Sequence, residues 1–212
     1  IAFSHDSCAL SPGGCSNVGR DGAGAEQSMV RVDGLGATFS GVTFLGAGNA
    51  ALHVTAANVS VSRATFSDCG GNCVEAHGAS FRMTQSWVRR YGTSYPSASG
   101  VVLNGATNSE LSRCDISDGY SAAVMAAAGG GSGARMNISF NRLHNVRPQA
   151  DSDGVSDSVC GIYASTFKAT EQNFFHNNEV SDIASWSGNG GAGWYGDGGS
   201  TAWTITSNLI HD

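Results

Sequence analysis

Residues 61–88 read VSRATFSDCGGNCVEAHGASFRMTQSWV, and this stretch contains the pattern that decides the fold. Its regularly placed apolar residues are Val61, Phe66, Val74, Met83 and Val88. They form two pairs, and the two members of each pair are five positions apart. A third apolar position, Val74, lies between the pairs, and the second pair begins 22 residues after the first. Glycine, asparagine, aspartate and serine, which favour turns, lie between the apolar segments. The stretch therefore predicts three short strands, separated by turns, in each repeat.

The same pair recurs along most of the chain. The seven pairs are Phe39/Phe44, Val61/Phe66, Met83/Val88, Leu111/Ile116, Ile138/Leu143, Phe175/Val180 and Ile205/Ile210. The intervening apolar stretches begin at Val30, Leu52, Val74, Val101, Val124, Ile162 and Trp194. A three-strand unit of this size cannot bury its own apolar side, so it must stack on copies of itself. The repeat predicts an all-β parallel solenoid of about seven coils, each with three short strands and with little or no helix.

Two further columns of residues fall at the expected corners of the coils. Two positions before the second apolar member are Val42, Ala64, Ser86, Cys114, Asn141, Asn178 and Asn208. Two positions after it are Gly46, Asp68, Arg90, Asp118, Asn145, Asp182 and Asp212. Asparagine and aspartate tolerate left-handed backbone and bond to neighbouring backbone groups, as a corner requires. Stacked asparagines are also expected to bond along the axis of the solenoid.

Three segments carry a resemblance to a known group: residues 141–146 (NRLHNV), 177–183 (NNEVSDI) and 207–212 (SNLIHD). They resemble the turn-and-strand repeat of the right-handed parallel β-helix proteins of the pectate-lyase-like superfamily. The resemblance extends from about Met29 to Asp212 and implies architecture more than activity, because this fold carries lyases, hydrolases, tailspikes and adhesive fibres. A leucine-rich repeat would need a regular leucine–asparagine frame, and a β-propeller would need hairpin turns; neither pattern is present.

The domain organisation expected from the repeat has two parts. Residues 1–28 are expected to form an N-terminal disulfide loop and an incomplete first coil. Residues 29–212 are expected to form the parallel β-helix, which we expect to continue beyond Asp212, because the last strand closes no cap and would expose unpaired edge groups.

The composition limits the partners. The net charge is −6, with 17 acidic residues against 11 basic ones, which argues against a nucleic-acid partner. No run of 18 apolar residues occurs, so no membrane span is expected.

Cys8/Cys15 and Cys69/Cys73 have spacings that suit local disulfides; a zinc site at Cys69/Cys73 lacks a second pair of ligands at suitable spacing. Asn58 and Asn137 begin N-glycosylation triplets. Together these features favour an extracellular or cell-surface location; the pairing of Cys114 and Cys160 stays open.

The distances between repeated segments predict a trough along one sheet. Three insertions, around residues 92–99, 147–159 and 184–192, fall at one corner, and a glycine-rich insertion at 129–133 falls at the other border of the same sheet. Loops at both borders of a rigid sheet commonly frame a binding cleft. We therefore expect ligands to lie along the outer face of the strands that begin at Val30, Leu52, Val74 and their successors.

Strand alternation gives two outward rows on this face. The first row is Arg31, His53, Glu75, Val102, Met125, Tyr163 and Tyr195, and the second is Asp33, Thr55, His77, Asn104, Ala127, Ser165 and Asp197. Arg31, His53, Glu75 and His77 are the candidate catalytic residues; Asp33, Asn104, Tyr163, Tyr195 and Asp197 are the candidate sugar contacts. Aromatic rings pack on the C–H faces of sugars, and polar groups bond to hydroxyls. The alternative is structural, since opposite charges on neighbouring strands also stabilise a sheet.

The candidate chemistry is limited by the acids available. Hydrolysis of a glycosidic bond normally uses two carboxyl groups, and Glu75 has no carboxylate on either neighbouring rung. The adjacent aspartates and Gly-His-Gly turn of polygalacturonase-like members are not present. Elimination from a uronic acid needs a base and a cation, and Arg31 or His53 could act as the base. Asp151, Asp153 and Asp157 surround Gly154 at the spacing of hard oxygen ligands, which makes a candidate calcium site.

The sequence thus predicts an extracellular module that contacts polysaccharide along one sheet, with lyase or glycoside hydrolase chemistry as candidate activities. The alternative, from a different class, is a structural module of a longer fibre or surface appendage with no catalysis. Its partners would be flanking segments or further copies stacked on the open end of the coil.

Overall fold

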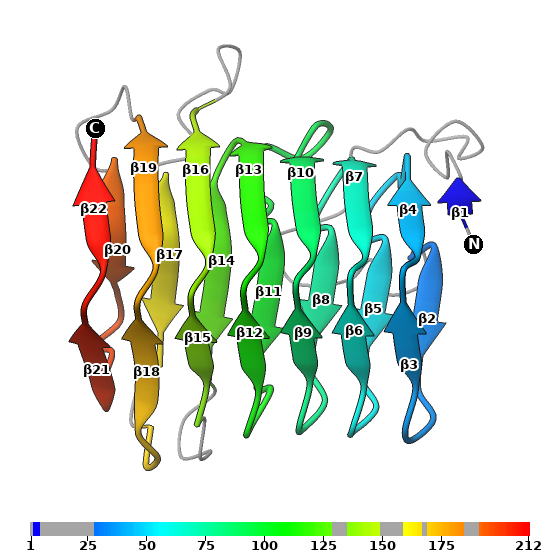
Figure 1. Cartoon of the computed structure of the whole chain (residues 1–212), viewed down its shortest axis with the longest axis horizontal. Coiled ribbons are helices and arrows are strands. Elements are labelled where there is room, and N and C mark those ends of the chain that lie inside the picture. The colour runs from blue at the N-terminus through cyan, green and yellow to red at the C-terminus, as the bar shows by residue number, and fades with distance from the viewer. Residues whose placement is uncertain (1, 5–27, 129–134, 149–158, 167–168, 185–190) are drawn as a thin grey trace.

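The computed structural model describes residues 2–4, 28–128, 135–148, 159–166, 169–184 and 191–212. In these residues the chain winds as a stack of coils, each contributing one strand to each of three parallel sheets, and no helix is present. Figure 1 shows sheets A and C facing the viewer and sheet B behind them. No helix in the described part of the chain has the length and hydropathy needed to cross a membrane.

The strands of each sheet follow the order of the coils. Sheet A contains β1 (Ala2–Ser4), β4 (Thr43–Leu45), β7 (Thr65–Cys69), β10 (Trp87–Tyr91), β13 (Asp115–Gly119), β16 (Arg142–Val146), β19 (Glu179–Ile183) and β22 (Leu209–His211). Sheet B contains β2 (Val30–Val32), β5 (Leu52–Val54), β8 (Val74–Ala76), β11 (Val101–Asn104), β14 (Ala122–Ala127), β17 (Cys160–Ser165) and β20 (Ala192–Gly196). Sheet C contains β3 (Thr38–Ser40), β6 (Ser60–Ser62), β9 (Arg82–Thr84), β12 (Glu110–Ser112), β15 (Asn137–Ser139), β18 (Asn173–His176) and β21 (Trp203–Thr206).

The register confirms the repeat predicted from the sequence. In sheet C, Phe39 pairs with Val61, and the same column continues through all the first members of the apolar pairs to Ile205. In sheet A, the column of second members runs from Phe44 to Ile210. In sheet B, the third column runs from Val30 to Trp194. The three apolar columns therefore line the interior of one continuous solenoid.

The core is built from these columns stacked along the axis. Phe66, Leu52 and Met83 are fully buried. The rings of Phe44 and Phe66 stack with centroids 4.6 Å apart, because a parallel in-register column places like side chains directly above one another. Each coil thus buries its apolar side against its neighbours, as a repeat that cannot bury its own apolar side must.

The polar corner columns have two different roles. All seven residues of the second column, from Gly46 to Asp212, have positive φ, as the sequence predicted for a left-handed corner. In the first column the left-handed residues lie one position earlier: Gly41, Arg63, Gln85, Arg113, Phe140, Asn177 and Ser207. The column itself points inward, and its buried asparagines bond along the axis: the Asn141 amide donates to Asn178 Oδ1 and the Asn178 amide donates to Asn208 Oδ1, each at 3.0 Å.

The cysteines are partly resolved by the structure. Cys69 and Cys73 form the predicted disulfide across the turn between β7 and β8, with their Cα atoms 5.4 Å apart. Cys114 and Cys160 are buried in the interior, and burial raises the pKa of each thiol to about 12. The pair predicted between Cys8 and Cys15 lies outside the described residues.

Candidate functional site

The outer face of sheet B carries the two rows expected from strand alternation. The register places Arg31, His53 and Glu75 side by side on β2, β5 and β8. Tyr163 and Tyr195 are neighbours on β17 and β20. The rows differ in exposure along the stack: Arg31 is exposed, whereas His53 and Glu75 are only 5% and 4% exposed although they point away from the core of the coil. The face is therefore open in some places and covered in others.

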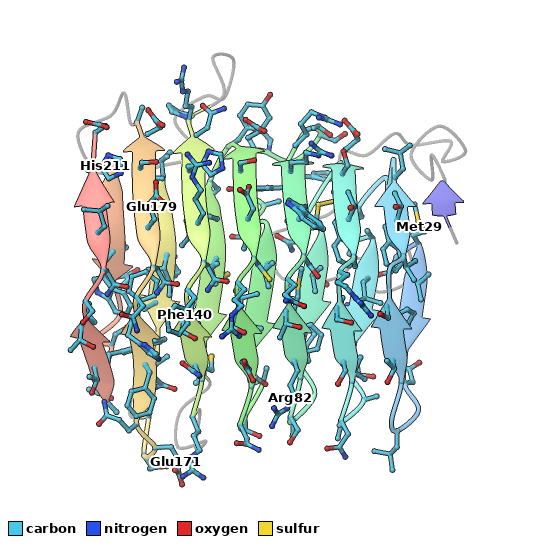
Figure 2. The ribbon with its side chains drawn as sticks, viewed as in Figure 1. Met29, Arg82, Phe140, Glu171, Glu179 and His211 are labelled. Carbon is cyan, nitrogen blue, oxygen red and sulfur yellow. A yellow bond between two sulfur atoms is a disulfide. The ribbon has the colours of Figure 1, made fainter. Side chains whose placement is uncertain are left out.

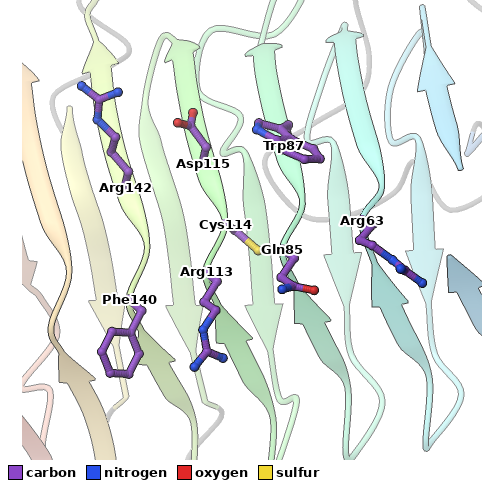
Figure 3. Close-up of a pocket in the computed structure, with 8 residues that line it drawn as sticks. All are labelled: Arg63, Gln85, Trp87, Arg113, Cys114, Asp115, Phe140 and Arg142. Atoms are coloured by element: carbon purple, nitrogen blue, oxygen red, sulfur yellow. The ribbon is translucent and has the colours of Figure 1, made fainter. Parts of the chain in front are cut away.

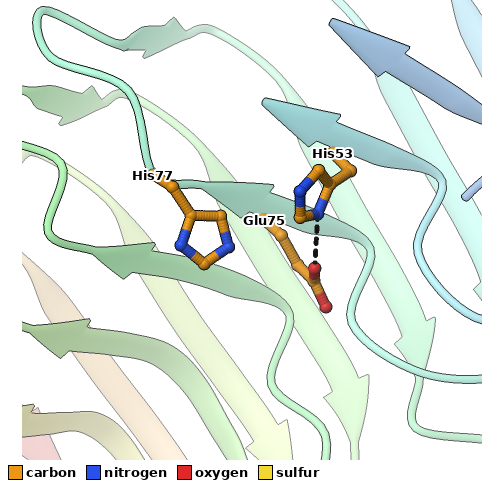
Figure 4. Close-up of side chains that lie close together, drawn as sticks. All are labelled: His53, Glu75 and His77. Carbon is orange, nitrogen blue, oxygen red and sulfur yellow. Dashed lines mark hydrogen bonds and ion pairs between the residues drawn. The ribbon is translucent and has the colours of Figure 1, made fainter. Parts of the chain in front are cut away.

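Three titratable side chains meet on β5, β8 and the residue after β8. His53 Nδ1 lies 2.8 Å from Glu75 Oε2, and the rings of His53 and His77 have centroids 5.1 Å apart (Figure 4). One potential ligand atom from each of the three lies within 4.8 Å of the other two. Glu75 and His77 both belong to this cluster because alternation along the strand turns Val74 and Ala76 inward and Glu75 and His77 outward.

Hydrogen bonds from the surrounding turns hold the cluster. Asn72, in the disulfide-closed turn, donates to Glu75 Oε1 at 2.6 Å, so both carboxylate oxygens of Glu75 are bonded. Asn72 Oδ1 accepts the Ser99 backbone N–H at 2.6 Å. Ser99 belongs to the insertion predicted around residues 92–99, whose Ser94 and Tyr95 N–H groups bond to the Gly70 carbonyl. The insertion and the disulfide turn therefore hold the carboxylate of Glu75 in place through Asn72.

The environment of His77 favours its neutral form. Burial, followed by the proximity of His53, lowers the pKa of His77 below its ordinary value, and the carboxylate of Glu75 and the nearby backbone of Asn104 only partly oppose this. At neutral pH His77 is thus an uncharged imidazole with a lone pair. Such a group can accept a proton or coordinate a metal ion.

Arg31 and Asp33 lie beside the cluster but bond to each other. Arg31 Nε donates to both carboxylate oxygens of Asp33, at 2.8 and 2.9 Å, and Asp33 also accepts the Thr55 hydroxyl at 2.5 Å. The bond from Thr55 and then the bond from Arg31 lower the pKa of Asp33. Arg31 and Asp33 are exposed and Arg31 makes no ion pair with Glu75 among the described contacts, so the structure brings together His53, Glu75 and His77 but holds Arg31 apart from them.

The predicted sugar contacts form a second group three strands along the same sheet. The rings of Tyr163 and Tyr195 stack, with centroids 5.6 Å apart and planes at 17°. The Tyr163 hydroxyl donates to Asp197 Oδ2 at 2.5 Å. Burial and then this bond raise the pKa of Tyr163 to about 12, and the same bond lowers the pKa of Asp197. Asn104 lies exposed on β11, between the two groups. Glu75 and Tyr163 are three rungs apart, or about 14 Å at the usual strand spacing.

The remaining predicted positions are placed as follows. Asn58 is exposed at the corner before β6, with positive φ. Asn137 is half-buried in β15, where its amide oxygen bonds to His176. The candidate calcium ligands Asp151, Asp153 and Asp157 lie outside the described residues, as do residues 129–133 and most of the insertions at 147–159 and 184–192.

A shallow cleft of about 510 Å³, not predicted from the sequence, lies at the corner between sheets C and A (Figure 3). Its lining residues are Arg63, Gln85, Trp87, Arg113, Cys114, Asp115, Phe140 and Arg142. Arg113 lies 5.5 Å from the centre of the Phe140 ring, and Figure 2 shows Phe140 at this corner. The repeat could have indicated this cleft. Its residues Arg63, Gln85, Arg113 and Phe140 form the column one position before the inward column, where a left-handed residue directs its side chain outward.

Comparison with known proteins supports the architecture. The family described as right-handed beta helix region matches residues 16–212, which covers most of the chain. No curated protein and no solved structure matches.

Proposed function

The chain belongs to the right-handed β-helix family, and we propose that it binds polysaccharide on the outer face of sheet B, at an extracellular or cell-surface location. The observation that carries the proposal is the stacked pair Tyr163/Tyr195 with Asp197 bonded to its edge. Two parallel rings on adjacent strands present an apolar platform for a sugar ring, and a carboxylate beside it can accept sugar hydroxyls. The disulfide between Cys69 and Cys73 supports an oxidising location.

The arrangement of strands suits a polymer better than a small ligand. Successive rungs repeat about every 4.8 Å along the axis. Asn104, on β11, and the exposed Asp33, beyond the end of β2, lie on the same face. A chain of sugars that follows the axis would meet the tyrosine platform first and these hydrogen-bonding groups further along. The proposal therefore predicts affinity that increases with the length of the oligosaccharide.

Retardation in gels that contain polysaccharide tests the proposal. The wild-type chain is expected to be retarded by at least one polymer in a panel of neutral and uronate-containing glycans. Tyr195→Ala should weaken that affinity about tenfold, which equals about 1.4 kcal/mol. Phe174→Ala removes an exposed ring from sheet C and serves as the matched control. Loss of affinity with Trp87→Ala in place of Tyr195→Ala would assign binding to the cleft between sheets C and A and contradict the proposal.

The same panel reports on cleavage. Elimination from a uronate releases unsaturated ends that absorb in the ultraviolet together with new reducing ends, whereas hydrolysis releases reducing ends without that absorbance. Among the described residues, Glu75 is the one carboxylate of the His53/Glu75/His77 cluster, which does not provide the two carboxyl groups that glycoside hydrolysis uses. We therefore expect binding without hydrolysis, that is, without reducing ends that lack the ultraviolet absorbance of elimination products.

A second candidate function is assembly, which the last described coil favours. Its inward-facing Ile205 and Ile210 are 44% and 51% exposed, and Leu209 is 60% exposed. Each of β20, β21 and β22 pairs with only one described strand, so a row of backbone donors and acceptors accompanies the apolar side chains. A further coil stacked here would cover both, and in this candidate function that coil comes from a second copy of the chain. Sedimentation should then show concentration-dependent association that Ile210→Glu abolishes; a monomer at every concentration would contradict this candidate.

A further inference from the structure

We propose that His53, Glu75 and His77 form a binding site for a Zn²⁺ ion on the outer face of sheet B, independent of any glycan. In the part of the chain that the structure describes, these three are the group of histidine, cysteine and acidic side chains whose ligand atoms converge, all within 4.8 Å of one another. Figure 4 shows the three side chains directed toward a common point from β5, β8 and the residue after β8.

The geometry is close to that of a tetrahedral site. A zinc ion with bonds of about 2.0–2.1 Å holds its ligand atoms about 3.4 Å apart. His53 Nδ1 and Glu75 Oε2 are 2.8 Å apart in a hydrogen bond, and they move apart by about 0.6 Å when the ion takes the place of the proton between them. The remaining adjustment falls on His77, which is half-buried and not part of the core. A rotation of its ring that moves the coordinating nitrogen by up to about 1.4 Å closes the separation from 4.8 Å to about 3.4 Å.

The donor atoms select zinc over calcium. Two imidazole nitrogens and one carboxylate oxygen suit a borderline-soft ion, whereas calcium takes six to eight oxygen ligands. Three protein ligands also leave one tetrahedral position open.

The surrounding groups orient the ligands as in a metal site. Asn72 holds the second oxygen of Glu75, and the insertion around residues 92–99 holds Asn72 through Ser99. The backbone of Asn104 lies close enough to the ring of His77 to affect its pKa. Such outer partners fix the orientation and tautomer of metal ligands. The hydrogen bond between His53 and Glu75 accounts for that pair, but it gives no reason for a second imidazole to be packed, partly desolvated, against the pair.

Calorimetric titration of the chelator-treated chain with ZnCl₂ alone tests the site. We expect one equivalent of Zn²⁺ to bind and Co²⁺ to bind in its place with the visible absorption bands of a four-coordinate site. His77→Gln should weaken Zn²⁺ binding by about 100-fold or more while the fold is retained. His144→Gln is the matched control, because His144 is half-buried and bonded to Asp115 on sheet A, away from the cluster.

Three results would overturn the proposal. The first is a chain that binds no Zn²⁺. The second is Zn²⁺ affinity that is the same in wild type and His77→Gln, which would place the ion at another group of residues. The third is displacement of Zn²⁺ by millimolar Ca²⁺, which would indicate an oxygen-ligand site. Circular dichroism of His77→Gln confirms that any loss of affinity does not come from unfolding, and the half-exposed position of His77 makes this variant preferable to one at the buried His53.

Discussion

At the scale of single residues, His77 links the stability of the coil to pH. Its pKa is lowered in the folded chain, mainly by burial, so the unfolded chain takes up a proton more readily. Stability from this group is complete above the unfolded pKa of about 6.5 and declines as the pH falls toward the lower folded pKa.

The prediction is a pH-dependent difference between wild type and His77→Gln in metal-free buffer. The midpoint of thermal unfolding of the wild type should fall more steeply than that of the variant between about pH 7 and pH 5, because glutamine does not titrate there. The two midpoints should run parallel above about pH 7.5. Parallel curves over the whole range would show that the burial of His77 has no energetic consequence.

Asn178 is the central member of the asparagine ladder and connects three coils. Its Oδ1 accepts from the backbone and side chain of Asn141, and its Nδ2 donates to the Ile138 carbonyl and to Asn208. Replacement by alanine leaves several buried groups without a partner, each worth about 1–3 kcal/mol.

Asn178→Ala is therefore expected to lower the free energy of unfolding by about 2–4 kcal/mol in chemical denaturation. Asn104→Ala, at an exposed position on β11, is the control and should change it by less than about 0.5 kcal/mol. Equal effects of the two substitutions would mean that the ladder contributes no more than a surface amide.

At the scale of the element, the turn between β7 and β8 combines the disulfide with support for the cluster. Cys69 and Cys73 close the turn, and Asn72 within it bonds to Glu75. The double variant Cys69→Ala/Cys73→Ala should lower the free energy of unfolding by about 2 kcal/mol, the loop-closure entropy expected for so short a loop.

The double variant should also weaken Zn²⁺ binding, since Asn72 loses its fixed position. The control is Cys114→Ala, which removes a buried thiol outside the turn and should leave Zn²⁺ affinity unchanged. Unchanged Zn²⁺ affinity in the double variant would show that the disulfide turn does not support the Zn²⁺ site.

The strands, their order and their register could be predicted from the sequence, because a parallel in-register stack repeats the same side-chain type in each coil. The columns that begin at Phe39, Phe44 and Val30 can therefore be found from the spacing of apolar residues alone. The corner between sheets C and A was misplaced by one residue, because Arg63, Arg113 and Phe140 do not belong to the types that usually adopt positive φ.

The site could be predicted only in part. Alternation gave the neighbours His53, Glu75 and His77, and also the pair Tyr163/Tyr195. It could not give their burial, because a side chain that points away from the coil can still be covered by other parts of the chain. It also could not show that Arg31 bonds to Asp33 in preference to Glu75, since both partners lie within reach of a long side chain.

At the scale of the whole molecule, the stack separates three surfaces with different chemistry. The outer face of sheet B carries the tyrosine platform and the His53/Glu75/His77 cluster. The corner between sheets C and A carries the cleft with Arg113 and Phe140. On sheet A, the ion pair Arg142–Glu179, at 3.5 Å, and the contact of His211 with Glu179, at 3.7 Å, join successive coils; Figure 2 labels Glu179 and His211. Pairs of this kind fit a solvated sheet face, which is consistent with our proposal that the ligand binds on sheet B.

The crystal structure of the chain with an oligosaccharide from a polymer that it retains would test this assignment most directly. We predict a sugar ring against Tyr163 and Tyr195, a sugar hydroxyl within hydrogen-bonding distance of Asp197, and a chain direction that follows the axis of the coils. A sugar bound in the cleft at Arg113 and Phe140, with the tyrosine pair untouched, would contradict the account.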